Sequence, residues 1–230
     1  MCSSDLLLSA GTKARDASQT LRVRDVRFSY GRHGPADVDI PDLELPQGEI
    51  TGIVGSNGVG KSTFARALCG LNKRARGTLE MDGSAFGPRQ RSHISYMVMQ
   101  DVNHQLFTDS VLDELLLSMD GDDETGDAVR AREILGSLDL SEKEDLHPMS
   151  LSGGERQRVA IGSAVASGKK LLLFDEPTSG LDYRHMLEVS KNLESLRRMG
   201  KTILLITHDA ELIHTCCTHL LNLTDRKSVV

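Results

Sequence analysis

The sequence predicts an α/β fold: a parallel β-sheet covered by helices on both faces, with a helical subdomain inserted in its middle. The first observation is that short, unbroken apolar runs, such as 171–174 and 202–206, have the length of buried strands and alternate with helical patterns. The second is that residues 101–150 change to largely helical spacing. No internal repeat is visible, so we expect one core sheet with one insertion.

The first half of the chain is expected to contribute strands around one helix. Leu21 to Tyr30 nearly alternates apolar and polar residues, which predicts a strand. Prolines interrupt residues 31–46, and an apolar strand is expected at Glu49 to Val54. Apolar residues at helical spacing predict a helix from Lys61 to Leu71. The remaining elements predicted here are a hairpin-like element at 77–81 and a strand at 94–99.

The second half begins with the helical subdomain. Helices are predicted at 111–119 and 129–138, and the acidic stretch between them, Asp120 to Asp127, is expected to be a solvated loop. A long helix follows Ser152 and runs to about Ala166. The remaining predicted elements are a buried strand at 171–174, an amphipathic helix at 183–198 and a second buried strand at 202–206.

These elements set the expected boundaries. The domain should cover 21–223, with its core at 21–100 and 167–223 and its helical subdomain at 101–166. The two ends do not resemble sequence selected for a fold, so we expect residues 1–20 to be poorly ordered and 224–230 to be a non-native tail.

The composition narrows the class of function. A hydrophobic content of 39% and a charged content of 26% are typical of a globular domain. A net charge of −6 and an aromatic content of 3% argue against nucleic acid as a partner. No apolar run approaches the length of a membrane span, so work at a membrane would need another chain to cross it. The four cysteines lack zinc-ligand spacing, which favours a reducing, cytosolic location.

A phosphate-binding loop is the first chemical motif. Residues 55–62 fit the pattern G-x-x-x-x-G-K-[ST] between a predicted strand and a predicted helix. Glycines let backbone N–H groups turn toward phosphate oxygens, Lys61 supplies a positive charge, and the Ser62 hydroxyl is placed to ligate Mg²⁺. The predicted nucleotide-binding residues are Gly55, Ser56, Asn57, Gly58, Val59, Gly60, Lys61, Ser62 and Thr63.

An acidic pair follows the buried strand at 171–174. Asp175 and Glu176 lie at its C-terminal edge, where α/β sheets place ligands. We expect Asp175 to hold Mg²⁺, at least partly through water. Because neighbouring strand residues point in opposite directions, Glu176 is expected to face the attacking water.

The run Leu-Ser-Gly-Gly-Glu-Arg-Gln-Arg at 151–158 is the most specific signal. Ser152 with Glu155 forms a capping box, which by itself indicates only a well-started helix. Two glycines in the first turn cost helix stability and instead indicate an uncrowded anion site. A second anion site makes sense if it serves the nucleotide of another copy. Its predicted residues are Leu151, Ser152, Gly153, Gly154 and Glu155.

These motifs, in this order, resemble those of ABC transporter ATPase domains over residues 21–223. The resemblance implies a RecA-like core with an N-terminal antiparallel β region and an inserted helical subdomain. It also implies ATP and Mg²⁺ as ligands, hydrolysis of ATP, and a second ATPase subunit paired head to tail. Each ATP would lie between the phosphate loop of one subunit and the 151–155 signature of the other. Integral membrane subunits are implied as further partners, at the cytoplasmic face of the membrane.

The same resemblance assigns roles to single residues. It implies that Tyr30 stacks on adenine and that Gln100 contacts Mg²⁺ and water. It implies that Asp182 communicates across the dimer and that His208 contacts the γ-phosphate. The implied catalytic residues are Glu176, His208, Gln100 and Lys61. The implied metal ligands are Ser62, Gln100 and Asp175.

The stretch from Met99 to Val111 is similar to the glutamine loop of energy-coupling-factor and cobalt-type importer ATPases, and it departs from their pattern at Asp101-Val102. This implies import of a vitamin or a metal ion. A small GTPase is disfavoured because Asn72-Lys-Arg-Ala75 lacks the final aspartate of its base-reading motif, and chromosome-maintenance ATPases because no coiled coil separates the motifs. A soluble, translation-factor-like ABC protein stays open as the alternative. The solute, and the choice between homodimer, heterodimer and fused double ATPase, also stay open.

Overall fold

The computed structural model describes residues 20–31, 37–119, 121, 123–224 and 228–229. Most of the segment expected to be poorly ordered, 1–19, lies outside the described residues, and the described chain starts in a strand at Thr20. The tail predicted to be non-native contributes Thr224 to the last long strand and Ser228–Val229 to a short one, while 225–227 and 230 lie outside the described residues.

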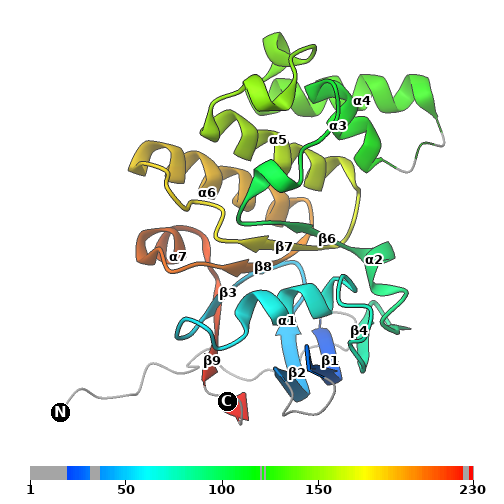
Figure 1. The fold of residues 1–230 in the computed structure, drawn as a ribbon, viewed down its shortest axis with the longest axis vertical. Helices are drawn as coiled ribbons and strands as arrows, with labels where there is room; N and C mark the ends of the chain where they lie inside the picture. Colours follow the sequence, from blue (N-terminus) through cyan, green and yellow to red (C-terminus); the bar gives the residue numbers. More distant parts are fainter. Residues whose placement is uncertain (1–19, 32–36, 120, 122, 225–227, 230) are drawn as a thin grey trace.

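An antiparallel sheet forms the base of the molecule (Figure 1). Its strands are β1 (Thr20–Phe28), β2 (Val38–Pro46), β4 (Thr78–Met81) and β5 (Ser84–Phe86), in the order β2-β1-β4-β5. The break in the alternation of β1 falls at Asp25, whose φ of 50° turns the chain so that Val26 and Phe28 join Leu21 and Val23 in one buried cluster. The sequence did not predict β2, because prolines punctuate it. As an edge strand, β2 tolerates Pro41, which has no N–H to donate.

A parallel sheet lies above this base. Its strands are β3 (Ile50–Val54), β6 (Ser95–Val98), β7 (Leu171–Asp175), β8 (Thr202–Ile206) and β9 (His219–Thr224), and β10 (Ser228–Val229) pairs antiparallel with β9. The order is β10-β9-β3-β8-β7-β6, so β3 runs between β9 and β8, and β6 is an edge. The predicted α/β fold with a parallel sheet and an antiparallel region is therefore confirmed.

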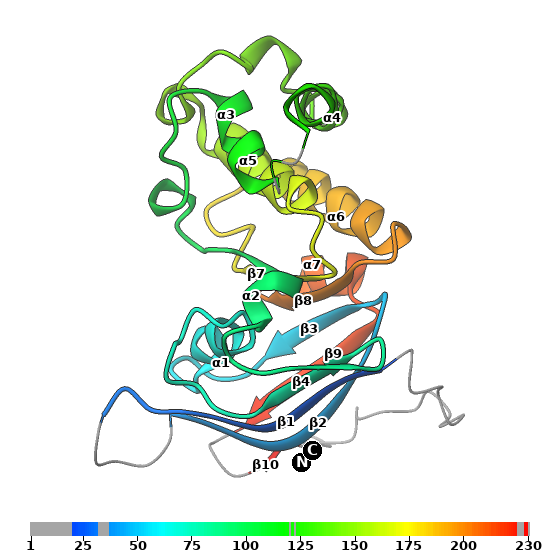
Figure 2. The same ribbon diagram turned by 90° about the vertical axis from the view of Figure 1, so that its right-hand side faces the viewer.

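Helix α1 (Lys61–Leu68) lies between the two sheets, as Figure 2 shows. Its buried face, which includes Phe64 and Leu68, shares one apolar cluster with residues of the antiparallel sheet and of β3, β7 and β8. The helix was predicted to continue to Leu71, but it ends at Leu68 because Gly70 adopts a φ of 74°, outside the helical region.

The other face of the parallel sheet is covered by α5 (Gly153–Ala166), α6 (Tyr183–Arg198) and α7 (Ala210–Cys216). Helices α3 (Val111–Ser118) and α4 (Glu124–Ser137) pack with α5 in the arm farthest from the antiparallel sheet (Figure 1). Short 3₁₀ turns lie at Val102–His104, Ser141–Lys143 and Pro148–Ser150, and α2 (Arg91–Ile94) precedes β6.

The acidic stretch 120–127 is not entirely a loop, which corrects the prediction. Helix α4 begins at Glu124, because the side chain of Asp123 caps it by accepting the backbone N–H of Gly126 at 3.1 Å. Residues 120 and 122 lie outside the described residues.

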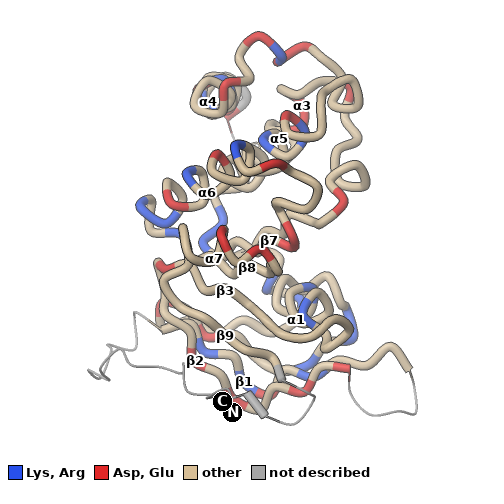
Figure 3. Tube along the Cα trace, turned by 90° about the vertical axis from the view of Figure 1, so that its left-hand side faces the viewer, with Lys and Arg blue, Asp and Glu red and all other residues tan. Residues whose placement is uncertain are grey.

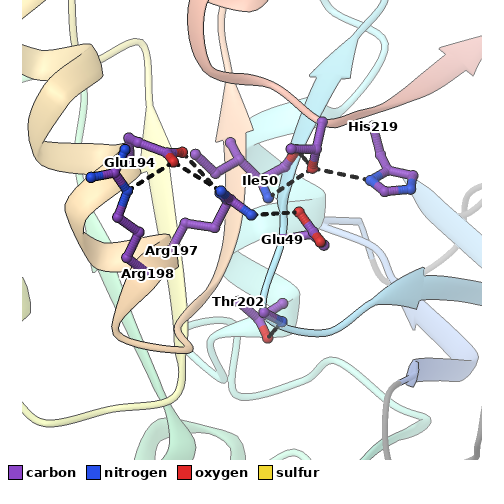
Figure 4. Close-up of polar contacts among 9 residues, drawn as sticks. Glu49, Ile50, Glu194, Arg197, Arg198, Thr202 and His219 are labelled. Carbon is purple, nitrogen blue, oxygen red and sulfur yellow. Dashed lines mark hydrogen bonds and ion pairs between the residues drawn. The ribbon is translucent and has the colours of Figure 1, made fainter.

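Charged side chains form ion pairs on the antiparallel sheet and also beside the parallel sheet. Basic and acidic residues are interspersed on the antiparallel sheet (Figure 3), where Arg22 pairs with Glu44 and Arg24 with Glu80, each at 2.9 Å. On the parallel sheet, Arg197 near the end of α6 contacts Glu49, just before β3, at 3.3 Å, and Glu194 at 2.8 Å (Figure 4). This second group ties the last turn of α6 to the start of the central strand.

Candidate nucleotide site

The phosphate loop joins the end of β3 to the start of α1, as predicted. A side chain at Gly55, where φ is 151°, would collide with the carbonyl oxygen of Leu223 on β9. Gly60 has a φ of 103°, and a Cβ there would lie 3.0 Å from the carbonyl oxygen of Asp37. Both positions therefore require glycine so that the loop can turn tightly beside neighbouring backbone.

Lys61 holds this loop in a curve. Its ammonium group donates to the carbonyl oxygens of Gly55 at 2.8 Å and Ser56 at 3.0 Å, and the residue is 7% exposed. An ammonium carries three protons, so the third remains for an anion in the cradle. The loop amides and the N-terminus of α1 add positive potential to the same place.

A cavity of about 590 Å³ opens beside the loop and collects most of the predicted residues. The predicted residues that line it are Asn57, Gly58, Gly60, Lys61, Ser62, Thr63, Gln100, Asp175, Glu176 and His208. It lies at the carboxyl ends of β3, β7 and β8, as expected for a ligand site of a parallel sheet. Ser179 and Ile206, which no sequence motif predicts as site residues, also line it.

Other predicted residues do not line this cavity. Among the loop residues these are Gly55, Ser56 and Val59, whose backbone shapes the turn. Tyr30 is 58% exposed, and its ring meets that of Phe28 edge to face at 4.7 Å. Its stacking on adenine stays a prediction. The signature residues and Asp182 also lie outside the cavity.

Ser62 and Asp175 come together as the metal prediction requires. The Ser62 hydroxyl donates to Oδ1 of Asp175 at 3.1 Å, and Asp175 is 4% exposed. Burial raises the pKa of the Asp175 carboxyl above its ordinary value, while the bond from Ser62 and the charges of Arg66 and Lys61 act in the opposite direction. A buried carboxylate beside a hydroxyl, with the Gln100 amide on the same cavity, is a set of hard oxygen donors that fits Mg²⁺.

The described residues contain no cluster of three or more His, Cys, Asp and Glu side chains that could hold a metal ion. Mg²⁺ usually shares its coordination with water and phosphate oxygens, which suits a site with few protein ligands.

Glu176 follows β7 but leaves the strand conformation, with a φ of 49°. The expected separation of Asp175 and Glu176 therefore comes from a left-handed turn and not from strand alternation. For a residue other than glycine this conformation costs about 1–2 kcal/mol. The Glu176 N–H donates to the carbonyl oxygen of Ile206 at 2.8 Å and holds the turn against β8. The turn aims the carboxylate at His208.

Gln100 lines the cavity just beyond the edge strand β6, and the side chain of Gln105 fixes the loop around it. Oε1 of Gln105 accepts the N–H of Met99 at 3.0 Å, and Nε2 donates to the carbonyl oxygen of Met97 at 3.2 Å. The Gln105 side chain thus makes hydrogen bonds to the backbone at this edge, as a neighbouring strand would. Asp101 starts the 3₁₀ turn by accepting the N–H of Asn103 at 3.0 Å. The chain therefore still forms a defined turn at Asp101-Val102, where its sequence departs from the pattern of the importer ATPases.

The signature forms the capped start of α5. Ser152 Oγ accepts the N–H of Glu155 at 3.3 Å, and Glu155 accepts the N–H of Ser152 at 2.8 Å, so the predicted capping box is present. Because Ser152 Oγ accepts this bond, its hydroxyl proton is free to donate to an anion. That the signature contacts the nucleotide bound to another copy of the chain stays a prediction.

No helix in the part of the chain that the structure describes has both the length and the apolar character needed to cross a membrane.

Residues 38–179 match the family described as ABC transporter. The chain is 44% identical, over 91% of its length, to a putative ABC transporter ATP-binding protein of Treponema denticola, and 37% identical, over 76%, to the methionine import ATP-binding protein MetN of Escherichia coli. It spans 42% of the first relative and 53% of the second, so it matches about half or less of each. Among solved structures it resembles cbiO1 from Clostridium perfringens, described as part of the ABC transporter complex cbiONQ, with a TM-score of 0.76 and 28% identity over 88% of this chain and 83% of that one.

The family match covers the phosphate loop, the signature and the acidic pair, which are the features that build and flank the cavity. This chain belongs to the ABC transporter ATP-binding family.

Proposed function

We propose that this chain is the ATP-binding subunit of a transporter, which hydrolyses ATP at a head-to-tail interface with a second ATPase domain to drive solute import. One observation carries the proposal. Five residues converge on a single cavity from two strand ends and one helix: Asp175 and Glu176 at the end of β7, His208 after β8, and Lys61 and Ser62 of α1. The signature on the same chain lies outside that cavity, where a second chain can use it.

The phosphate loop binds and orients the nucleotide. Inward backbone N–H groups, the free proton of the Lys61 ammonium and the start of α1 all favour the β- and γ-phosphates. Mg²⁺, when bound, neutralises developing charge on the phosphate oxygens. Ser62, Asp175 and Gln100 are the residues that would hold it. Asp175 and Gln100 lie at adjoining strand ends and Ser62 lies in the first turn of α1, so these elements fix the geometry before ATP arrives.

Glu176 and His208 complete the hydrolytic part. The Glu176 carboxylate accepts a proton from, or orients, the water that attacks the γ-phosphate in line. His208 restrains that carboxylate, with Nε2 at 3.4 Å from Oε1 of Glu176, and would contact the γ-phosphate. Catalysis of this kind rests on positioning and charge neutralisation.

The signature supplies the other wall of the site. The free hydroxyl proton of Ser152 and the N-terminal amides of α5 form an anion site at the surface of this chain. In a head-to-tail dimer they would close over the γ-phosphate bound to the partner. Asp182 lies at the start of α6 and would act across the same interface.

Import of a vitamin or a metal ion by an energy-coupling-factor system is the finer part of the proposal. The Met99 to Val111 stretch supports it by its similarity to that subgroup, as does the likeness to cbiO1. The likeness to a methionine importer supports only the broader proposal of import. The chain would then work as a peripheral subunit at the cytoplasmic face of the membrane, with integral membrane subunits as partners. Phe107, 72% exposed beside α3, belongs to the surface that would receive them.

The test is ATP hydrolysis by the purified chain as a function of its concentration, with and without Mg²⁺. Activity that requires Mg²⁺ and rises more steeply than linearly with protein concentration supports a shared site. Activity that is strictly proportional to concentration and survives disruption of the signature would identify a monomeric NTPase instead. Import is tested separately, by co-expression with a membrane protein encoded next to this gene and uptake of labelled vitamins and metal ions into vesicles.

A further inference from the structure

The two signature glycines lie in different surroundings. Around Gly153, nothing lies within 4 Å of the place where a Cβ would stand. Around Gly154, a Cβ would stand 3.2 Å from Cδ2 and 3.5 Å from Nε2 of His185. The first glycine thus leaves open space at the surface, whereas the second leaves room for an imidazole ring of the same chain.

The other side of that ring is bound to Asp182. Oδ1 of Asp182 accepts the backbone N–H of His185 at 2.9 Å and contacts its ring Nδ1 at 2.7 Å. Since an ionised carboxylate only accepts hydrogen bonds, Nδ1 is assigned the proton. The pKa of the Asp182 carboxyl is lowered, first by the backbone bond and then by the ring, which agrees with this geometry.

His185 therefore bridges two segments that belong to different helices. Gly154 is in the first turn of α5, Asp182 is the N-cap of α6, and the two helices lie side by side in Figures 1 and 2. One turn further along, Arg158 of α5 pairs with Glu188 of α6 at 3.2 Å. The register between the helices is thus set at two successive levels, and the first level touches the signature.

We propose that His185 is a positioning residue that fixes the signature turn relative to Asp182, so that both surfaces meet the partner subunit as one unit. This inference rests on the head-to-tail dimer of the proposed function. It does not place His185 in contact with nucleotide: the ring acts through Gly154 on one side and through Asp182 on the other. Loss of either contact should uncouple the two surfaces.

Two substitutions separate the contacts. His185→Asn keeps a donor near Asp182 but removes the ring from Gly154, and His185→Phe keeps a ring but removes the donor. Each would be made in the full chain carrying Glu176→Gln, which should hold ATP without turning it over. The measurements are the affinity of the monomer for a fluorescent ATP analogue and the ATP-dependent dimerisation constant from sedimentation.

We expect monomer affinity to stay unchanged in both variants and dimerisation to weaken by about fivefold or more, the usual scale of coupling between sites. If either variant dimerises like its Glu176→Gln parent, the bridge is not needed and the inference is wrong. If the parent itself does not dimerise with ATP, the proposed function fails, and this inference fails with it. Far-ultraviolet circular dichroism and melting curves establish that both variants are folded.

Rescue gives an independent check. While His185 is present, the added methyl group of Gly154→Ala should press against the ring and weaken dimerisation. In a chain that also carries His185→Ala, the same substitution should weaken dimerisation much less. Gly153→Ala is the matched control, because nothing lies near that position, so its effect should be the same in both backgrounds. If Gly154→Ala weakens dimerisation equally in the two backgrounds, the ring is not what requires this glycine.

Discussion

Nε2 of His208 lies 3.4 Å from Oε1 of Glu176, across the adjoining ends of β8 and β7. The backbone N–H of His208 donates to the other carboxylate oxygen, also at 3.4 Å. The Glu176 side chain is only 17% exposed, so these contacts leave it few orientations. The left-handed turn at Glu176 and the parallel pairing of the two strands are what bring the pair together.

Glu176→Gln should retain ATP binding and slow hydrolysis by about 10²–10⁴-fold, the usual worth of a general base. The amide keeps the size of the side chain but cannot take a proton from water. Single-turnover hydrolysis and equilibrium binding, measured on the same preparation, separate the two effects. Wild-type turnover by this variant in a competent dimer would remove Glu176 from the mechanism.

Lys61→Ala should lose nucleotide affinity instead. The ammonium supports both the phosphates and the loop carbonyls of Gly55 and Ser56, and hydrogen bonds to charged groups contribute about 1.5–3 kcal/mol each. We expect ATP to bind at least about tenfold more weakly, as titration with a fluorescent analogue would show. Lys73→Ala, in the loop after α1, serves as the control and should bind normally.

Gly153→Leu should block hydrolysis without destabilising the isolated chain. The position faces open space, and leucine favours a helix more than glycine does, so the melting temperature should hold or rise. In the dimer, the added side chain would displace the γ-phosphate of the partner, and misplacement of about 1 Å can cost 10²-fold in rate. ATP affinity of the monomer should not change.

The control for this variant is Lys191→Leu, an equally drastic change on the exposed face of α6. Undiminished hydrolysis by Gly153→Leu would argue that the signature does not act on nucleotide, and the site would then be complete within one chain.

Several elements could be predicted from the sequence because their signals are local. The strands at Leu171–Asp175 and Thr202–Ile206 are buried runs of apolar residues, and α6 has a strongly amphipathic pattern. The phosphate loop and the capping box are likewise fixed patterns of neighbouring residues. Such features do not depend on knowing which strands lie side by side.

What the sequence could not predict depends on distant contacts. Strand β2 is acceptable only because it is an edge, and the seven-residue helix α7 has no clear apolar period. The left-handed turn at Glu176 is held by the carbonyl oxygen of Ile206 on the next strand. Ile206 itself enters the cavity through its place at the end of β8. The similarity of residues Met99 to Val111 to a family's glutamine loop covers Gln105, but it assigned no role to that residue.

Gln105→Leu should lower kcat with little change in KM for ATP. It removes the bonds to the N–H of Met99, the carbonyl oxygen of Met97 and the Tyr96 hydroxyl, which frees the edge of β6 and the loop that carries Gln100. The loss of the two backbone bonds alone is worth about 2 kcal/mol, or roughly 30-fold if all of it is felt in the transition state. His104→Ala, whose side chain is 82% exposed, is the matched control in the same turn. An equal rise in KM would assign Gln105 to nucleotide binding instead.

The group around Arg197 should make stability depend on pH in the acid range. Hydrogen bonding from Arg197, and then from Arg198, lowers the pKa of the Glu194 carboxyl from its ordinary value of 4.5 to about 2 (Figure 4). Because the folded-state pKa lies below the unfolded one, the contribution of this carboxylate is fully present above pH 4.5. It is lost as the pH falls toward 2, where the folded state also takes up the proton.

Glu194→Gln should therefore lower the free energy of unfolding at pH 6–7, and the difference from the unmodified chain should close progressively between about pH 4.5 and pH 2. Urea denaturation at a series of pH values and constant salt measures it, provided that unfolding stays reversible. Because the Glu194 side chain is 30% exposed, added salt should shrink the difference at pH 7. Glu133→Gln, on the exposed face of α4, is the control and should show no such closure. A difference that is constant across this pH range would mean that Glu194 contributes through packing and not through its charge.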